Sequence, residues 1–116
     1  MCSSDLPIVE IAPKNAAFFD FAAKYGAGAT DEIVPARISS GATARVQAIG
    51  LAAHRALGCR GVSRTDVILA PGDQPYVLET NTLPGLTPAS LLPKAAAHAG
   101  LDYAALLSRI VSNALR

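Results

Sequence analysis

Tryptophan is absent from this 116-residue chain, methionine occurs once, and aromatic residues make up only 5%. Charged residues are also scarce at 16%, against about a quarter in an ordinary soluble domain. A net charge of +1 excludes the strongly basic surface that nucleic acid requires, so we expect no nucleic-acid partner. No stretch reaches the roughly 18 apolar residues of a membrane span, so we expect no membrane partner.

Cysteine is scarce too. Cys2 and Cys59 fit no metal-ligand spacing, and so few thiols in a chain of this size indicate reduced cysteines in the cytoplasm. The two histidines, His54 and His98, are isolated, and we interpret them as ordinary helix residues. The chain is 51% hydrophobic, with a mean hydropathy of +0.32, which suits a buried core. The low charged fraction predicts a surface that is partly covered.

The first six residues have neither the basic nor the apolar region of a signal peptide. Within them, Cys-Ser-Ser-Asp-Leu also matches a translated sequencing-adapter end. We therefore predict that residues 1–6 are non-native, that the coding sequence continues upstream, and that one domain or part of a domain spans residues 7–116.

The pattern of apolar residues predicts an α+β domain. We expect helices at 41–57, 88–100 and 102–115 and strands at 7–13, 32–35, 61–69 and 75–81. Gly58 is placed to end the first helix, Thr87 and Pro88 to begin the second, and Asp102 to cap the third. The turn-rich segment 70–74 should join two neighbouring antiparallel strands.

Those two strands carry the chemistry. Because side chains alternate along a strand, Arg64 and Asp66 share one face, as do Glu79 and Asn81. A lone Asp66 would be an ordinary surface carboxylate. Two carboxylates in adjacent apolar strands repel each other unless a cation compensates. The pattern therefore predicts a magnesium site, with the arginine beside it available to phosphate or to a developing oxyanion.

The same residues resemble a known family. Arg64-Thr-Asp66, Leu78-Glu-Thr-Asn-Thr-Leu-Pro-Gly85 and Ser90-Leu-Leu-Pro-Lys-Ala95 are similar to the D-alanine–D-alanine ligases, an ATP-grasp family. Residues 18–25, Phe-Phe-Asp-Phe-Ala-Ala-Lys-Tyr, resemble a further family segment, although Phe19, Phe21 and Ala22 replace two tyrosines and a glutamate. The resemblance runs from about Leu6 to Arg116. It implies the carboxy-terminal part of an ATP-grasp fold, with an antiparallel sheet and packed helices.

The resemblance also implies a ligand set for ATP and two Mg²⁺ or Mn²⁺ ions. Asp66 would hold one ion, Glu79 would bridge both, and Asn81 would hold the second. Arg64 and the Gly85 amide would stabilise the oxyanion. On the residues alone, Arg64 could equally form a salt bridge, and Gly85 could complete a type II turn after Pro84.

Further roles follow from the same resemblance. Ser90 and Leu91 would receive the carboxylate of the second D-alanine, with helix capping by Ser90 as the alternative. Lys24 and Tyr25 would lie on a mobile loop over the site, near phosphate and substrate. Phe18 and Leu78 would flank adenine, although core packing explains both equally well.

The implied function is ATP-dependent ligation of two D-alanines through an acyl phosphate, for peptidoglycan synthesis in the cytoplasm. The complete enzyme would be a homodimer. A D-alanine–D-lactate ligase, another ATP-grasp carboxylate–amine ligase, and a degenerate nucleotide-binding or interaction domain are the alternatives.

Overall fold

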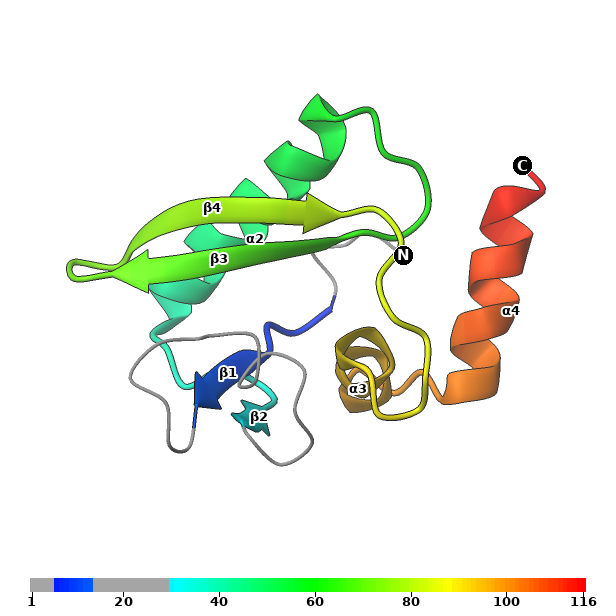
Figure 1. The fold of residues 1–116 in the computed structure, drawn as a ribbon, viewed down its shortest axis with the longest axis horizontal. Helices are drawn as coiled ribbons and strands as arrows, with labels where there is room; N and C mark the ends of the chain where they lie inside the picture. Colours follow the sequence, from blue (N-terminus) through cyan, green and yellow to red (C-terminus); the bar gives the residue numbers. More distant parts are fainter. Residues whose placement is uncertain (1–5, 14–29) are drawn as a thin grey trace.

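A computed structural model describes residues 6–13 and 30–116 of the chain. The predictions made for Phe18, Lys24 and Tyr25 lie outside these residues. The described elements combine helices with short antiparallel strands (Figure 1), in the order β1 (Glu10–Pro13), β2 (Thr30–Ile33), α2 (Ser40–Ala56), β3 (Arg64–Ala70), β4 (Gln74–Asn81), α3 (Leu91–His98) and α4 (Tyr103–Ala114). This arrangement confirms the predicted α+β class.

The strands form two separate antiparallel pairs among the described residues, β1 with β2 and β3 with β4. The predicted strand 7–13 is wrong in its first half, because β1 begins only at Glu10, and the strand expected at 32–35 starts earlier, at Thr30. The strand expected at 61–69 is also shifted, since β3 spans Arg64–Ala70. Pairing with a partner strand sets these limits, and alternation along one strand cannot report it.

Helix α2 packs behind the β3–β4 hairpin, in contact with both strands (Figure 1). Its ends follow local signals. The Ser39 hydroxyl accepts a hydrogen bond from the Ala42 amide at 3.1 Å, and Gly58 adopts a φ of +67° just beyond the helix. A residue with that φ terminates a helix readily only when it lacks a Cβ. The predicted stop at Gly58 is confirmed.

The largest apolar cluster lies between α3 and α4. Leu92, Ala96 and Leu106 are its buried centre, and the partly buried residues around it are Leu6, Val62, Leu86, Leu101 and Ile110. The Asp102 carboxylate caps α4 by accepting from the Ala105 amide at 2.8 Å, as the sequence predicts. Part of the apolar surface of α4 lies outside this core, since Val111 is 58% exposed.

The prediction for the start of α3 is wrong. Thr87 and Pro88 form part of a turn, closed by the Ser90 amide donating to the Thr87 carbonyl at 2.9 Å, and the helix begins at Leu91 with Ser90 at its N-cap position. The helix ends at His98, and Gly100 follows with a φ of +90°. Nowhere in the described part of the chain is a helix long and apolar enough to cross a membrane.

Candidate active site

The β3–β4 hairpin carries the predicted polar residues on one face. Asp66 lies directly opposite Glu79, and Arg64 lies opposite Asn81. Opposed residues of an antiparallel pair project to the same side, about 5 Å apart at Cβ. Two carboxylates, an amide and a guanidinium are therefore brought together, as predicted. Figure 1 shows that this end of the hairpin points toward α3 and α4, whereas its turn points away.

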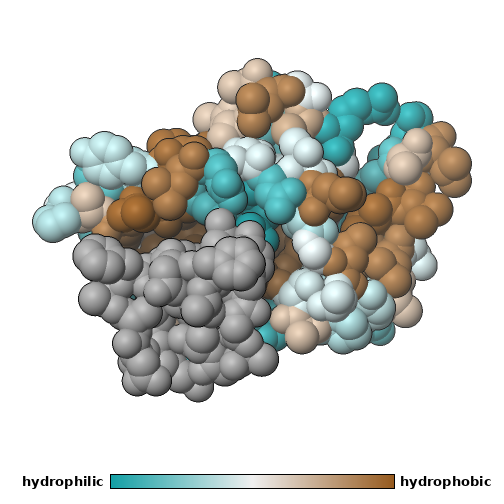
Figure 2. Space-filling view, viewed as in Figure 1, coloured by the Kyte–Doolittle hydropathy of each residue, from teal (hydrophilic) through white to brown (hydrophobic). Residues whose placement is uncertain are grey.

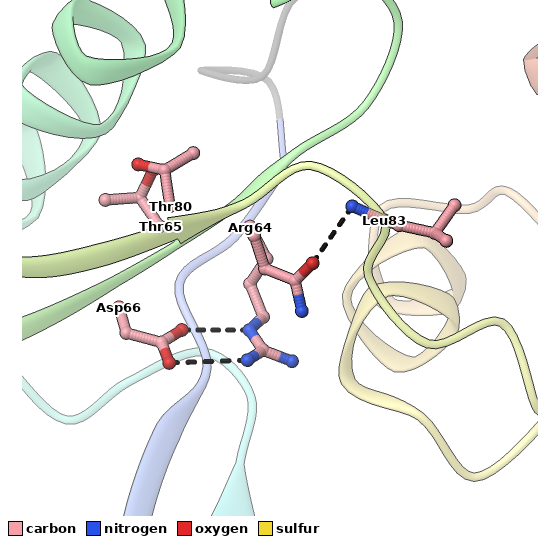
Figure 3. A network of polar contacts seen from close by, with 6 residues as sticks. Arg64, Thr65, Asp66, Thr80 and Leu83 are labelled. Atoms are coloured by element: carbon pink, nitrogen blue, oxygen red, sulfur yellow. Dashed lines mark hydrogen bonds and ion pairs between the residues drawn. The ribbon is translucent and has the colours of Figure 1, made fainter. Parts of the chain in front are cut away.

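Arg64 and Asp66 form a two-pronged ion pair (Figure 3). Arg64 Nε lies 2.8 Å from Asp66 Oδ1, and Nη2 lies 3.3 Å from Oδ2. Both side chains are about three-quarters covered, with 28% and 22% of their surfaces exposed. A bidentate, partly desolvated pair holds both groups in one geometry more strongly than an exposed pair does. The salt-bridge interpretation of Arg64 is confirmed, and the guanidinium still lies on the carboxylate face.

The opposite face of the hairpin has a different character. Thr65 and Thr80 lie opposite each other there, and their hydroxyls are 3.0 Å apart (Figure 3). The register shifts beyond the neighbouring Asp66–Glu79 pair, because Asp66 pairs with Glu79 while Val67 pairs with Val77. Leu78 is thus an extra residue in β4, and it is 60% exposed. Core packing is therefore not its role, and the prediction that it flanks adenine remains a prediction.

Asn81 ends β4 with its side chain tied to the backbone. Asn81 Oδ1 accepts a hydrogen bond from the Leu83 amide at 2.9 Å. An amide oxygen has two lone pairs, so this contact fixes its orientation and leaves one lone pair available. The chain leaves the sheet at this point and enters the loop of residues 82–90.

Gly85 lies in that loop against Ser90. A Cβ added to Gly85 would be 2.9 Å from the Ser90 hydroxyl, closer than side chains pack. Gly85 is not among the glycines with a positive φ, so the type II turn considered for Pro84-Gly85 is wrong. The missing side chain makes room for Ser90.

The simple capping role considered for Ser90 is wrong. Ser90 occupies the N-cap position of α3, yet its side chain makes no capping hydrogen bond. Its hydroxyl instead accepts from the Thr87 amide at 3.1 Å and lies 2.6 Å from the Thr87 hydroxyl. Sequence reasoning assigned Thr87 to the start of the helix and missed its contact with Ser90, although a hydroxyl residue three positions before Ser90 is a visible signal of a local side-chain network.

The oxygen donors on the hairpin fit a divalent cation. In the described ranges there is no group of three or more His, Cys, Asp or Glu that could hold a metal. Asp66 opposite Glu79, with an amide oxygen on the same face, is an open set. Such a set suits Mg²⁺, which keeps waters or phosphate oxygens in its remaining positions.

Two further ion pairs join the β1–β2 sheet to its surroundings. Arg37 contacts Glu10 through its backbone amide at 2.9 Å and through Nη2 at 2.7 Å, and Lys94 of α3 pairs with Glu32 of β2. The side-chain hydrogen bond from Arg37, reinforced by its backbone amide, lowers the pKa of Glu10 below 4.5. These contacts hold the β1–β2 sheet against α3 and against the segment that leads into α2.

Comparison with known proteins identifies the architecture. The structure superposes on a crystal structure of a Bacillus anthracis D-alanine–D-alanine ligase complexed with ATP with a TM-score of 0.77, 39% identity, and coverage of 96% of this chain and 34% of that one. A second structure of the Bacillus anthracis ligase gives a TM-score of 0.79, 42% identity, and coverage of 96% and 36%. The described fold is therefore part of an ATP-grasp ligase fold.

Sequence comparison identifies a family within the ATP-grasp ligases. A family model described as D-ala D-ala ligase C-terminus matches residues 4–112. The chain is 51% identical over 111 residues to the D-alanine–D-alanine ligase of Syntrophobacter fumaroxidans, covering 95% of this chain and 35% of the relative. It is 52% identical over 109 residues to that of Anaeromyxobacter sp., covering 94% and 35%. The chain belongs to the D-alanine–D-alanine ligase C-terminus family, and it spans about a third of the length of the curated relatives it matches.

Proposed function

We propose that this chain supplies the metal-binding and oxyanion-binding part of an ATP-dependent D-alanine–D-alanine ligase. The observation that carries the proposal is the shared face of the β3–β4 hairpin, on which Asp66 opposes Glu79 and Arg64 opposes Asn81. Relatives that are half identical across the matched region are D-alanine–D-alanine ligases, and an ATP complex is known for a structural relative. ATP and two D-alanines are the substrates that this assignment implies.

Asp66, Glu79 and Asn81 are the residues that would hold Mg²⁺ at the ATP phosphates. The bound ions would neutralise negative charge on the phosphates during transfer to the first D-alanine carboxylate. Glu79 lies between the other two donors, since it faces Asp66 across the ladder and is two residues from Asn81 on the same face. That central position suits a shared ligand, and the Leu83 amide keeps Asn81 Oδ1 in a fixed orientation.

Arg64 is placed to stabilise the oxyanion formed when the second D-alanine attacks the acyl phosphate. Its guanidinium is fixed through Nε and Nη2 by Asp66, which leaves other guanidinium hydrogens to donate. A donor held in place before the reaction needs no reorganisation when the charge develops. The Gly85 amide is the second donor of the proposal. Gly85 lies in the loop that leaves this end of the hairpin.

Ser90 is proposed to bind the carboxylate of the second D-alanine, together with the Leu91 amide at the start of α3. The amide groups in the first turn of a helix favour an anion, and a hydroxyl adds a donor. Ser90 and Gly85 are in contact range of each other, so the carboxylate site would adjoin the oxyanion site. An amino acid bridging the two would present its amine toward the acyl phosphate.

A chimeric ligase tests the proposal. The amino-terminal two thirds of the Syntrophobacter fumaroxidans ligase would be joined to residues 6–116 of this chain, which match it at 51% identity. We expect D-alanine-dependent phosphate release and a D-alanyl-D-alanine product detected by mass spectrometry. The same chimera with Asp66→Asn is the matched control and should be inactive. A folded chimera that hydrolyses ATP without D-alanine, or that forms only an ester with D-lactate, would contradict the proposal.

A further inference from the structure

Each of the three described helices has an N-cap residue whose side chain could cap it. Only two of these side chains form the capping hydrogen bond. The Ser39 hydroxyl accepts from Ala42 at 3.1 Å, and the Asp102 carboxylate accepts from Ala105 at 2.8 Å. Ser90 stands at the corresponding position of α3 and makes no such bond. A side-chain cap usually contributes about 1 kcal/mol to a helix. The Ser90 hydroxyl forgoes this contribution and contacts Thr87 instead.

Thr87 holds it. The Thr87 amide donates to Ser90 Oγ at 3.1 Å, and the Thr87 hydroxyl oxygen lies 2.6 Å from the same atom. A serine hydroxyl accepts two hydrogen bonds and donates one. When the Thr87 hydroxyl donates, both lone pairs of Ser90 Oγ are filled, and the remaining hydrogen of Ser90 must point away from Thr87. In that state Ser90 can act only as a donor to a third group.

The surroundings keep this pair in place. Gly85 lies close to Ser90, because a Cβ at Gly85 would come within 2.9 Å of Ser90 Oγ. The Tyr103 hydroxyl of α4 donates to the Leu86 carbonyl, which ties the loop to the next helix. The turn is closed by the Ser90 amide donating to the Thr87 carbonyl at 2.9 Å. A contact with α4 and a hydrogen bond within the turn thus restrain the loop that carries Thr87 and Ser90.

We propose that Thr87 is a positioning residue that commits the Ser90 hydroxyl to donate to the carboxylate of the second substrate. This role rests on the proposed function, since it assumes that a carboxylate binds at Ser90. A carboxylate can only accept hydrogen bonds, so a hydroxyl with both lone pairs occupied selects it over a neutral group that must also donate. Thr87 would thereby contribute to affinity and selectivity for a free carboxylate, without touching the reacting atoms.

The test uses the active chimera with Thr87→Val and Thr87→Ser. Valine keeps the shape and removes the hydroxyl, and serine restores it. We expect Thr87→Val to raise the KM for the second D-alanine roughly tenfold, as losing one oriented hydrogen bond would, with kcat and the KM for ATP within about twofold. Thr87→Ser should stay within about twofold of the parent. Thr65→Val removes a comparable hydroxyl pair behind the hairpin and should leave the KM for D-alanine unchanged.

A double-mutant cycle separates orientation from folding. Ser90→Ala should raise the same KM, and adding Thr87→Val to it should cost nothing more, because the hydroxyl that Thr87 orients is gone. Thr87→Ala, which also removes the hydroxyl, supplies a second route if Thr87→Val fails to fold, and it should raise this KM as well. Additive effects of Thr87→Val and Ser90→Ala, or an active chimera indifferent to Thr87→Val, would overturn the inference alone. An inactive parent chimera would overturn the proposed function and the role of Thr87 with it.

Discussion

Asp66 lies directly opposite Glu79 across the β3–β4 ladder, so two carboxylates face the same side of one hairpin. Like charges placed opposite each other destabilise an antiparallel pair unless something compensates. Arg64 compensates at Asp66 through its two-pronged contact. A divalent cation would compensate across both carboxylates. This relationship underlies the first two predictions.

Replacing Glu79 by glutamine should abolish ligation in the chimera while leaving the fold intact. The change removes the negative charge opposite Asp66 but keeps the size of the side chain. We expect at least a hundredfold loss of phosphate release with D-alanine, the scale on which one preorganised electrostatic group acts. Mn²⁺ affinity, measured by electron paramagnetic resonance, should fall in parallel. The matched control is Glu10→Gln on the other sheet, where Glu10 pairs with Arg37. Parent-like turnover in Glu79→Gln would remove Glu79 from the metal site.

Replacing Arg64 by lysine should lower kcat about 10- to 100-fold with little change in the KM for ATP. Lysine keeps the positive charge beside Asp66 but cannot reproduce the planar contact through Nε and Nη2. Steady-state kinetics with ATP and D-alanine varied separately would measure the change in kcat and the change in the KM for ATP. Arg37→Lys is the control, since it makes the same change in an exposed pair. A defect confined to ATP affinity would place Arg64 at the nucleotide and exclude the oxyanion role.

The Glu10–Arg37 pair should make stability depend on acid pH. Hydrogen bonds from the Arg37 side chain and backbone lower the pKa of Glu10 below 4.5 in the folded chain. A carboxyl with a depressed folded pKa stabilises the fold above its unfolded pKa, and this contribution is lost as the pH falls through the folded value. Glu10→Gln should therefore lower the urea midpoint of the 116-residue chain at pH 7 and leave it unchanged near pH 2. A difference in urea midpoint between the parent and Glu10→Gln that persists at pH 2 would show that the effect is not due to ionisation of Glu10.

The 116-residue chain made alone should be inactive and should associate. It spans about a third of its relatives, and several large apolar side chains of the hairpin are uncovered. Figure 2 shows hydrophobic surface over the hairpin, and Ile68, Tyr76 and Leu78 are 54%, 57% and 60% exposed. Exposed apolar patches promote association.

Light scattering on the purified chain would measure this association, and calorimetry with Mg·ATP would measure nucleotide binding. Ile68→Lys should reduce the apparent mass, whereas Leu115→Lys, at an exposed position near the end of the chain, should not. A monomer that binds ATP with micromolar affinity would contradict this prediction.

Much of the site was determined by local rules and could be read from the sequence. Side chains alternate along any strand, so Arg64 with Asp66, and Glu79 with Asn81, had to share a face. The turn at 70–74 predicted that the two strands pair, and the register places all four residues together. Gly58 and Asp102 mark helix ends because a positive φ and a capping carboxylate act within one turn of the chain.

Only the tertiary structure decided how separate segments meet. Leu78 became the extra residue of β4 because the register shifts between Asp66 and Val67, which alternation along β4 alone does not reveal. Helix α3 begins at Leu91 because the Ser90 hydroxyl turns back to Thr87, displacing the Thr87-Pro88 start that local propensity favours. Ser90 also requires the space left by Gly85. Backbone and side-chain preferences are properties of a few consecutive residues, whereas register and orientation depend on which groups compete for the same partner in space.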